Sequence, residues 1–412
     1  MNYELFLAKR IITAKQYKSS ISSSIIKIAI TAIALGVVIM MVSIATGVGL
    51  QKKIKEKISG FNGHVQIANY EDNNSQITVT PISIQQEFYP TFLDVEGIKN
   101  VQTYATKAGI IRTETDFEGI IYKGVNSDYD WSFFKEYLID GELLTIDNEL
   151  TDNVLVSKLT ADRLGFKVGD TFNTFFMKND DATAAPNARV FKVVGIYNSG
   201  FKEFDETYVI GDIKHVQRLN KWEKDQIGGF EVLIDDFDEL DKKGEEIYQS
   251  VPSTLNSVTI AEKYGPIFEW LSLLDNNIIM IIAIMIIIAG INMITALLVL
   301  ILERTQMIGI LKSLGSNNWS IRKMFLYNAA YLIAIGLFWG NIIGVGLLLL
   351  QKYFGFIRLD PENYYVTEAP VYIGFLYIIL LNVGALLLCL LMLLIPSYIV
   401  SKISPVKAIK FD

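Results

Sequence analysis

Residues that commonly carry catalysis or bind metals are scarce in this sequence. Its 412 residues include one cysteine, Cys389, and two histidines, His64 and His215, so no set of side chains has the spacing of a zinc site. A G-x-S-x-G nucleophile motif and a G-x-x-x-x-G-K-[ST] phosphate-binding loop are both absent. These absences exclude a disulfide within one chain and a P-loop ATPase on this chain. We therefore expect a non-catalytic chain that binds no metal and no cofactor itself.

Hydrophobic residues, by contrast, make up 51% of the sequence. Four apolar runs are long enough to cross a hydrocarbon core of ~30 Å at a helical rise of about 1.5 Å per residue. The first run has an alternative interpretation as a cleaved signal peptide. Its apolar stretch is longer than the roughly 7–15 residues of such a peptide, and a long segment precedes it, so we favour a membrane span.

The two signs of charge are distributed unevenly along the chain. Residues 51–277 contain 23 Lys and Arg against 38 Asp and Glu, a net charge of −15, whereas the rest contains 14 against 6, a net charge of +8. The basic residues outside 51–277 lie in the N-terminal segment, the segment after the second span and the C-terminal tail. The positive-inside rule then predicts a multi-pass protein with cytoplasmic N and C termini and a large outer domain.

The predicted segments follow from these two patterns. Residues 1–24 are expected to form an amphipathic helix on the inner membrane surface. The apolar positions that recur at helical spacing are Leu5, Phe6, Ala8, Ile11 and Ile12, and they stand among the basic residues Lys9, Arg10 and Lys15. The remaining predicted segments are span 25–50, outer domain 51–277, span 278–302, helix and loop 303–324, span 325–350, outer loop 351–370, span 371–395 and cytoplasmic tail 396–412.

The outer domain alternates short strand-like and helix-like pieces. This alternation predicts an α+β fold, with two subdomains, inserted between the first and second of four transmembrane helices. The strand candidates are 64–68, 76–80, 101–112, 118–124, 153–157, 171–177, 190–197, 206–210 and 231–234, and the helix candidates are 83–93, 157–164 and 237–251.

One connection in the outer domain is longer than a tight hairpin needs. Residues 178–189 (KNDDATAAPNAR) join two strand candidates and end on Pro186 and Arg189. From the residues alone, a plain loop is favoured over a docking finger.

A short amphipathic segment follows the second span. The apolar run of the second span stops at the charged pair Glu303 and Arg304, and apolar residues at helical spacing follow it. Gly315 is placed to end that short helix, and Ser316 or Asn317 is placed to cap the next helix. A short surface helix between two membrane helices indicates a device that passes force across the membrane surface. The residues assigned to it are Glu303, Arg304, Met307, Ile310, Leu311, Lys312 and Gly315.

These residues also carry a family resemblance. The run 303–315 (ERTQMIGILKSLG) resembles the E-[RK]-x4-[GA]-I-L-x3-G stretch of FtsX/MacB-type (type VII) ABC transporter permeases, and 403–409 (ISPVKAI) resembles their P-x-x-A-[LI] ending. One large MacB-like outer domain and four spans are similar too, so the resemblance covers essentially the whole chain. Within this family, the segments most similar to the lipoprotein-releasing permeases LolC and LolE are 34–38 (ALGVV), 58–65 (ISGFNGHV), 359–365 (LDPENYY) and 178–189.

The resemblance implies partners and roles that the residues alone do not. A separate LolD-like ABC ATPase dimer would bind ATP and Mg and receive the 303–315 helix, and the second permease would be another copy or a LolC/LolE-like paralogue. Loop 178–189 would be the hook, with Pro186 and Arg189, that docks a LolA-like periplasmic carrier. The substrate would be a lipoprotein among membrane lipids, with no nucleic acid. The apolar cavity for it would be lined by Val38, Met41, Val42, Ala45, Ile288, Ile291 and Met293.

Three functions are therefore open at this point. The first is a lipoprotein-releasing permease of the bacterial inner membrane with a periplasmic outer domain. The second is a mechanotransmission permease, either of MacB-type efflux or of FtsX-type control of a cell-wall hydrolase. The third is a membrane-anchored receptor or enzyme without an ATPase, which the amphipathic stripe in 303–315 disfavours.

Overall fold

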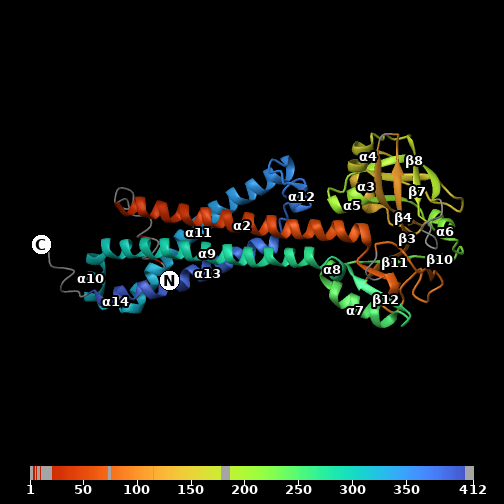
Figure 1. The fold of residues 1–412 in the computed structure, drawn as a ribbon. Helices are drawn as coiled ribbons and strands as arrows, with labels where there is room; N and C mark the ends of the chain where they lie inside the picture. The colour runs from red at the N-terminus through yellow and green to blue at the C-terminus, as the bar shows by residue number, and fades with distance from the viewer. Residues whose placement is uncertain are drawn as a thin grey trace. The chain divides into compact units, whose positions relative to one another are not determined.

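The computed structural model describes residues 3, 4, 6, 10, 21–72, 76–114, 116–177 and 186–403 (Figure 1). The chain forms two compact units. The helical unit comprises Met1–Leu50, Trp270–Ile357 and Ala369–Asp412, and the α+β unit comprises Gln51–Glu269 and Arg358–Glu368. Most of the predicted helix 1–24 and the end of the tail, 404–412, lie outside the described residues.

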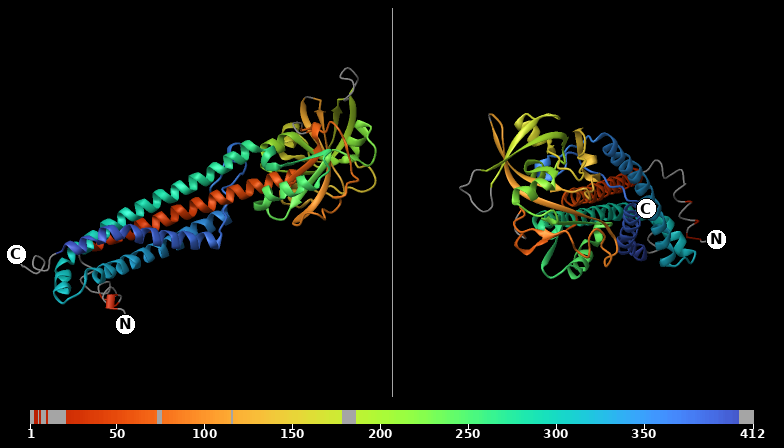
Figure 2. Two further views of the ribbon diagram at one scale, coloured as in Figure 1. Left: turned by 90° about the horizontal axis from the view of Figure 1, so that it is seen from below. Right: turned by 90° about the vertical axis from the view of Figure 1, so that its right-hand side faces the viewer.

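The helical unit contains four long helices that run alongside one another (Figure 2). Within the part of the chain that the structure describes, these are the helices long and apolar enough to cross a membrane. Together with the α+β unit, they confirm the predicted fold class. The helices are α2 (Ile21–Asn62), α9 (Gly265–Glu303), α11 (Asn318–Phe354) and α13 (Phe375–Ser397), with the short α10 (Thr305–Ser313) and α14 (Ile399–Lys402).

Two of these helices extend well beyond their apolar runs. Helix α2 continues through the polar sequence QKKIKEK and ends at Asn62, directly before Gly63, which has a φ of +72° that favours glycine. Helix α9 already begins at Gly265. Lys, Glu and Gln are good helix formers, so nothing in the polar segment after the first span ends α2 at the apolar boundary.

Close backbone approach holds α11 against α2. Helix α11 presents a glycine at every fourth position, the spacing that lets membrane helices pack tightly. A Cβ built at Gly340 would lie 2.8 Å from the Val37 Cβ and 2.9 Å from the Ala34 carbonyl oxygen. Contacts of the same kind join Gly336 to Ile33 and Gly344 to Met41.

Two asparagines join α11 to α13. The Asn341 Nδ2 donates to the Asn382 Oδ1 at 2.6 Å, and the Asn382 Nδ2 donates back to the Asn341 Oδ1 at 2.9 Å. Each amide also donates to a carbonyl of its own helix. These bonds pair the two polar side chains with each other between the apolar helices.

A mixed sheet of ten strands organises the α+β unit. Its order is β12-β1-β11-β3-β4-β9-β6-β8-β5, and β7 pairs with both β3 and β8; β2 and β10 form a separate pair. The strands are β1 (Val65–Asn69), β2 (Ile82–Ser83), β3 (Ile98–Arg112), β4 (Phe117–Val125), β5 (Leu138–Gly141), β6 (Asn153–Ser157), β7 (Thr171–Phe176), β8 (Asn187–Tyr197), β9 (Tyr208–Asp212), β10 (Gln226–Ile227), β11 (Gly229–Ile234) and β12 (Leu255–Thr259). Because one sheet runs through the whole unit, the division into two subdomains stays a prediction.

Short helices connect these strands. They are η2 (Tyr70–Asp72), α3 (Ser132–Tyr137), α4 (Lys158–Leu164), α5 (Lys202–Thr207), α6 (Ile213–Asn220), η3 (Phe237–Glu239), α7 (Leu240–Ser250), α8 (Ile260–Lys263) and α12 (Pro361–Tyr364). The expected strand at 76–80 and the expected helix at 83–93 are both wrong. Residues 84–93 form turns, since Pro90 disfavours a helical residue before it and Ile82–Ser83 pairs with β10 instead.

The last turn of α2 is packed into the core of the α+β unit. Phe61, which is fully buried, stacks on Phe204 with ring centroids 4.4 Å apart and contacts Phe134 and Tyr208 edge-on or tilted. A Cβ at Gly63 would lie 2.8 Å from the Glu231 Cβ, so the chain turns there into β1 with no room for a side chain. This packing fixes the end of α2 to the sheet.

The segment Arg358–Glu368 is more than the simple outer loop expected from the sequence. The Tyr365 ring stacks on Phe201 at 4.7 Å, and the Lys57 Nζ donates to the Tyr365 carbonyl oxygen at 3.1 Å. The connection between α11 and α13 thus packs on the α+β unit through α12 and Tyr365.

Candidate functional site

The predicted coupling helix is present as α10, and its ends follow the predicted signals. Gly315 has a φ of +91° and its N–H donates to the Lys312 carbonyl oxygen, and the Asn317 side chain caps α11 by accepting from the Ser320 N–H at 2.7 Å. Of the charged pair before α10, Glu303 is the exposed last residue of α9 and Arg304 is the half-buried residue that precedes the first turn. The surface available to a partner is therefore decided by which side chains of α10 point outward.

Only part of the predicted apolar stripe on α10 is open to a partner. Met307 and Leu311 are partly buried against the core of the helical unit, and Ile308 between them is fully buried. Ile310 is 48% exposed and Leu314 is 78% exposed. Of the apolar residues on α10, Ile310 and Leu314 are thus the most exposed, while Met307 and Leu311 are half-buried.

Lys312 has a structural role that the sequence did not indicate. Its Nζ donates to the carbonyl oxygens of Val400 and Ile403, both at 2.8 Å, and more distantly to that of Ser401. These carbonyls lie at the C-terminal end of α14, where a cation is stabilised by the helix dipole. Lys312 therefore joins the coupling helix to the end of the α13–α14 segment.

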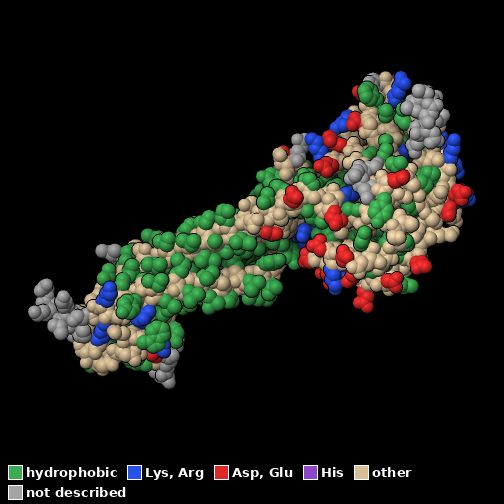
Figure 3. All heavy atoms as spheres, turned by 60° about the horizontal axis from the view of Figure 1, so that its bottom comes forward, with side chains coloured by type: hydrophobic (Ala, Val, Ile, Leu, Met, Phe, Trp, Pro, Cys, Tyr) green, Lys and Arg blue, Asp and Glu red, His purple; other side chains and the backbone are tan. Residues whose placement is uncertain are grey.

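A second cation acts at the same end of the helical unit. The Arg322 side chain donates to the Ser397 Oγ at 3.1 Å and to the Leu394 carbonyl oxygen at 3.0 Å, beside Pro396 in α13. Basic side chains gather at the end of this unit where α10 and α14 lie, while apolar side chains cover the rest of the visible face (Figure 3). The basic residues that predicted topology also hold the ends of the helices together.

The hook is described only at its base. Strands β7 and β8 pair as an antiparallel hairpin in which Phe176 lies opposite Asn187 and Thr174 lies opposite Arg189. Pro186 is exposed and Arg189 is half-buried, with its Nη1 donating to the Ala188 carbonyl oxygen. The tip, 178–185, lies outside the described residues, so the hook's docking role stays a prediction.

The seven predicted cavity residues do not converge in one chain. Val38, Met41 and Ala45 are buried inside the helical unit, Val42 is partly buried, and Met41 packs against Gly344 of α11. On α9, Ile288 and Ile291 are exposed, whereas Met293 is fully buried. At 3.6 residues per turn, Met293 lies roughly 140° around the helix from Ile288, so these residues cannot all line one space.

Sequence reasoning missed a buried polar cluster in the α+β unit. The Lys123 Nζ lies 2.6 Å from the Glu231 Oε1, and the two side chains are 2% and 1% exposed. The Lys123 Nζ also donates to the carbonyl oxygen of Phe61, in the last turn of α2. Glu231 further accepts from Gln102 at 2.9 Å. A charged residue inside each of the apolar runs GIIYKGV and GFEVLI was the signal that could have found the pair.

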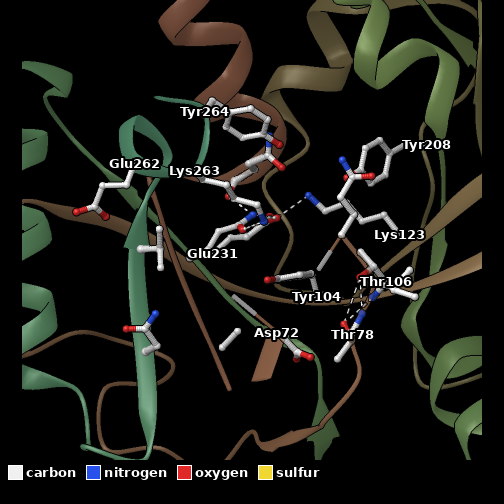
Figure 4. Close-up of a pocket in the computed structure, with 17 residues that line it drawn as sticks. Asp72, Thr78, Tyr104, Thr106, Lys123, Tyr208, Glu231, Glu262, Lys263 and Tyr264 are labelled. Atoms are coloured by element: carbon white, nitrogen blue, oxygen red, sulfur yellow. Dashed lines mark hydrogen bonds and ion pairs between the residues drawn. The ribbon is translucent and has the colours of Figure 1, made fainter. Parts of the chain in front are cut away.

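This cluster borders a cavity of about 500 Å³ on one face of the sheet (Figure 4). The Lys263 Nζ reaches it from α8 and donates to the Gln66 Oε1 at 2.5 Å. Burial lowers the pKa of the Lys123 and Lys263 ammonium groups, and the Glu231 carboxylate opposes this shift at both. Within the described residues, no cluster of three or more His, Cys, Asp or Glu side chains could hold a metal ion.

Comparison with known proteins shows which families and relatives this chain is similar to. Residues 28–248 match the model of the MacB-like periplasmic core domain, and residues 279–405 match that of the FtsX-like permease C-terminal region. The lipoprotein-releasing system transmembrane protein LolE of Haemophilus influenzae is 21% identical over 421 residues, covering 99% of both chains. LolC of the same organism is 25% identical over 288 residues, covering 69% of this chain and 68% of LolC. The periplasmic region of MacB from Actinobacillus actinomycetemcomitans aligns with a TM-score of 0.33 and 16% identity over 52% of this chain and 95% of that structure.

The two family models follow one another along the chain and together cover most of the first membrane helix and of the outer domain, and the last three membrane helices. The core-domain model alone covers more than half of the chain. The chain therefore belongs to the family of FtsX/MacB-type membrane permeases with a MacB-like periplasmic core domain.

Proposed function

We propose that this chain is the permease subunit of an ATP-driven lipoprotein-releasing transporter of the bacterial inner membrane. It would extract lipoproteins from the outer leaflet and pass them to a LolA-like periplasmic carrier. Its partners would be a LolD-like ATPase dimer and a second permease, either another copy or a LolC/LolE-like paralogue. In this orientation, both termini and α10 are cytoplasmic and the α+β unit is periplasmic.

The exposed face of α10 is the observation that carries ATPase coupling. Ile310 and Leu314 are large apolar side chains left open on a helix whose opposite side is buried. An amphipathic helix with a free apolar face fits a hydrophobic groove on a partner. Removing acyl chains from a bilayer costs about 0.8 kcal/mol per CH₂, so release needs an external energy source, which a chain without a phosphate-binding loop must receive from a partner.

The specific substrate class rests on similarity along the whole length. LolE, a lipoprotein-releasing system transmembrane protein, aligns with this chain over 99% of both sequences, so the similarity includes the spans, the outer domain and the tail of this chain. The β7–β8 hairpin supports a carrier-docking hook, since it brings Pro186 and Arg189 to the base of the predicted finger. The lipoprotein substrate and the carrier go beyond the family assignment, so they need a test of their own.

The end of α2 supports force transmission to the outer domain. A lever must be fixed where it delivers its motion, and Phe61 is held by stacked rings and by the Lys123 ammonium at its carbonyl. Helix α9 enters the same unit after a capping box formed by Thr259 and Glu262.

Reconstitution tests the proposal directly. Proteoliposomes would contain this chain, its co-purifying partners and a fluorescent triacylated lipoprotein, with a LolA-like carrier outside. We expect ATP-dependent transfer of the lipoprotein to the soluble fraction, and none with a non-hydrolysable ATP analogue. ATP turnover without transfer, together with export of a soluble peptide or activation of a wall hydrolase, would favour the MacB- or FtsX-type alternative.

A further inference from the structure

A cation–aromatic cluster, made of Trp319, Arg322, Lys323 and Tyr398, lies where α11 begins and α13 ends. The Arg322 guanidinium carbon is 5.3 Å from the centre of the Trp319 ring and 5.7 Å from the centre of the Tyr398 ring. The Lys323 Nζ is 5.6 Å from the centre of the same Trp319 ring. At such distances the face of an aromatic ring attracts a cation, so the rings help to hold both charges in place.

The cation–aromatic cluster lies at the polar boundary of two membrane helices. Trp319 precedes the apolar stretch of α11, which begins at Phe325, and Tyr398 follows the apolar stretch of α13, which ends at Ile395. Trp319 is 48% exposed and Tyr398 is 57% exposed. Tryptophan and tyrosine are enriched at the level of lipid headgroups, because their rings are apolar at one end and polar at the other. The position and the exposure of both rings therefore place the cluster at headgroup level.

The two cations keep donors that the protein does not use. A guanidinium group carries more N–H donors than the two that Arg322 directs at the Ser397 Oγ and the Leu394 carbonyl oxygen. In the described part of the chain, no carboxylate forms an ion pair with Arg322 or Lys323. The Glu4 carboxylate, which accepts a hydrogen bond from the first turn of α11, interacts with the charge of Lys323. One carboxylate beside two cations leaves an excess of positive charge, which favours an anion.

An exposed apolar surface begins beside this cluster. Ile395 and Leu391 precede Tyr398 by about one and two turns on the same face of α13, and they are 82% and 58% exposed. In a bilayer, acyl chains cover such a surface, because burying apolar groups against one another is favourable. A soluble anion at the cluster would leave this surface uncovered. A ligand with an anionic head and apolar chains fits both parts.

We propose that the cation–aromatic cluster binds the phosphate group of an anionic phospholipid. The unused Arg322 N–H groups and the Lys323 ammonium group donate to the phosphate oxygens, and the acyl chains lie along Ile395 and Leu391. Basic sites between membrane helices bind anionic headgroups in this way. A zwitterionic lipid fits less well, because it brings a positive group to a cluster that already has an excess of positive charge. This inference goes beyond the transport function proposed above and does not depend on the transported substrate.

Native mass spectrometry of the full chain, delipidated in detergent, tests this proposal without an ATPase or a carrier. The chain is titrated with phosphatidylglycerol and with phosphatidylcholine of the same acyl length. We expect the first phosphatidylglycerol to bind at least about fivefold more tightly, since one basic residue near an anionic lipid contributes roughly that factor. Glycerol 1-phosphate carries the charged group without the chains, so it should not displace the lipid at about 10 mM, which would saturate a millimolar site. Displacement would assign the cluster to a soluble phosphate and overturn the proposal.

Matched charge removals locate the site. Lys323→Gln removes a charge that lies beside the Trp319 ring and Glu4, and it should weaken phosphatidylglycerol binding about fivefold while changing phosphatidylcholine binding little. Lys352→Gln removes an exposed lysine from the other end of α11 and should leave the affinity for the first phosphatidylglycerol unchanged. Trp319→Leu keeps both cations and should weaken binding roughly two- to fivefold, because a ring that holds them is lost.

The proposal is overturned if phosphatidylcholine binds as tightly as phosphatidylglycerol, or if Lys323→Gln and Lys352→Gln weaken binding equally. It is also overturned if Lys323→Gln leaves the lipid preference unchanged. Loss of a cytoplasmic ATPase from the purified complex in that variant would then identify the cluster as a contact with the partner protein.

Discussion

Replacing Lys123 by methionine should strongly destabilise the α+β unit. The substitution keeps most of the side-chain volume but removes the ammonium group that lies 2.6 Å from the Glu231 Oε1. Glu231 is 1% exposed, so it would remain buried without the ammonium group that pairs with it. Breaking a buried ion pair on one side typically costs about 3–5 kcal/mol. Gln102 still donates to Glu231 at 2.9 Å, so we expect the lower part of that range.

The double variant separates the value of the pair from the cost of leaving one charge alone. Lys123→Met combined with Glu231→Leu removes both charges, and such replacements of buried pairs are often close to neutral. We therefore expect the double variant to be more stable than either single variant, with a coupling free energy of several kcal/mol. An exposed ion pair serves as the control. The side chains of Lys158 and Asp162 are 50% and 66% exposed, so Lys158→Met should lower the free energy of unfolding by less than about 1 kcal/mol.

Hydrogen exchange of the full chain in nanodiscs is the suitable assay. Amides of β4 and β11, which carry Lys123 and Glu231, exchange only when the sheet opens and so report the stability of this unit separately from the membrane helices. The reasoning is refuted if the single variants exchange like the wild type, or if the double variant loses the sum of the two single losses.

Three further predictions concern other parts of the molecule. Burial, with Lys99 nearby, lowers the pKa of His64 to about 4, and the His64 Nδ1 accepts the Ile234 N–H at 3.2 Å. Between pH 6.5 and 4 the unfolded chain therefore binds a proton that the folded chain does not, so the free energy of unfolding should fall by up to about 3 kcal/mol as the pH drops. In denaturant titrations, His64→Asn should make this pH dependence weaker. Lys312→Met should increase hydrogen exchange in the α14 segment at least tenfold, while Lys312→Arg retains much of the protection. Unchanged exchange in both variants would show that Lys312 does not stabilise the end of α14. Substituting Pro186 and Arg189 should abolish site-specific crosslinking to a LolA-like carrier without changing ATPase co-purification, and undiminished crosslinking would take the hook out of the mechanism.

The local signals in the sequence located several elements correctly. Residues 153–157 were predicted as a strand and form β6, and the predicted helix 157–164 is present as α4, which Ser157 caps. A short apolar strand and an adjacent serine cap are both local patterns. The helix at 83–93 failed for a non-local reason, since Ile82–Ser83 pairs with β10 far along the chain. Helix α6 was missed although Asp212 caps it by accepting the Lys214 N–H.

The candidate site shows the same division between local and non-local information. The ends of α10 were predicted because Gly315 and Asn317 act on their immediate neighbours. Which face of α10 stays open depends on packing against other helices, so the sequence did not distinguish half-buried Leu311 from exposed Leu314. The bonds of Lys312 reach carbonyls 88–91 residues away, which no local pattern contains.

Co-purification of a cytoplasmic ATPase tests the central claim most directly, namely that α10 receives work from a separate motor. Tagged chain carrying Ile310→Glu would be compared with Ile310→Val, which keeps the position apolar on a residue that is 48% exposed and so should not disturb the fold. A charge buried in an apolar groove costs several kcal/mol, equivalent to at least a hundredfold loss of affinity. We predict that the ATPase is recovered with the wild type and Ile310→Val and is lost with Ile310→Glu. Equal recovery with all three, or no ATPase with any of them, would contradict the account.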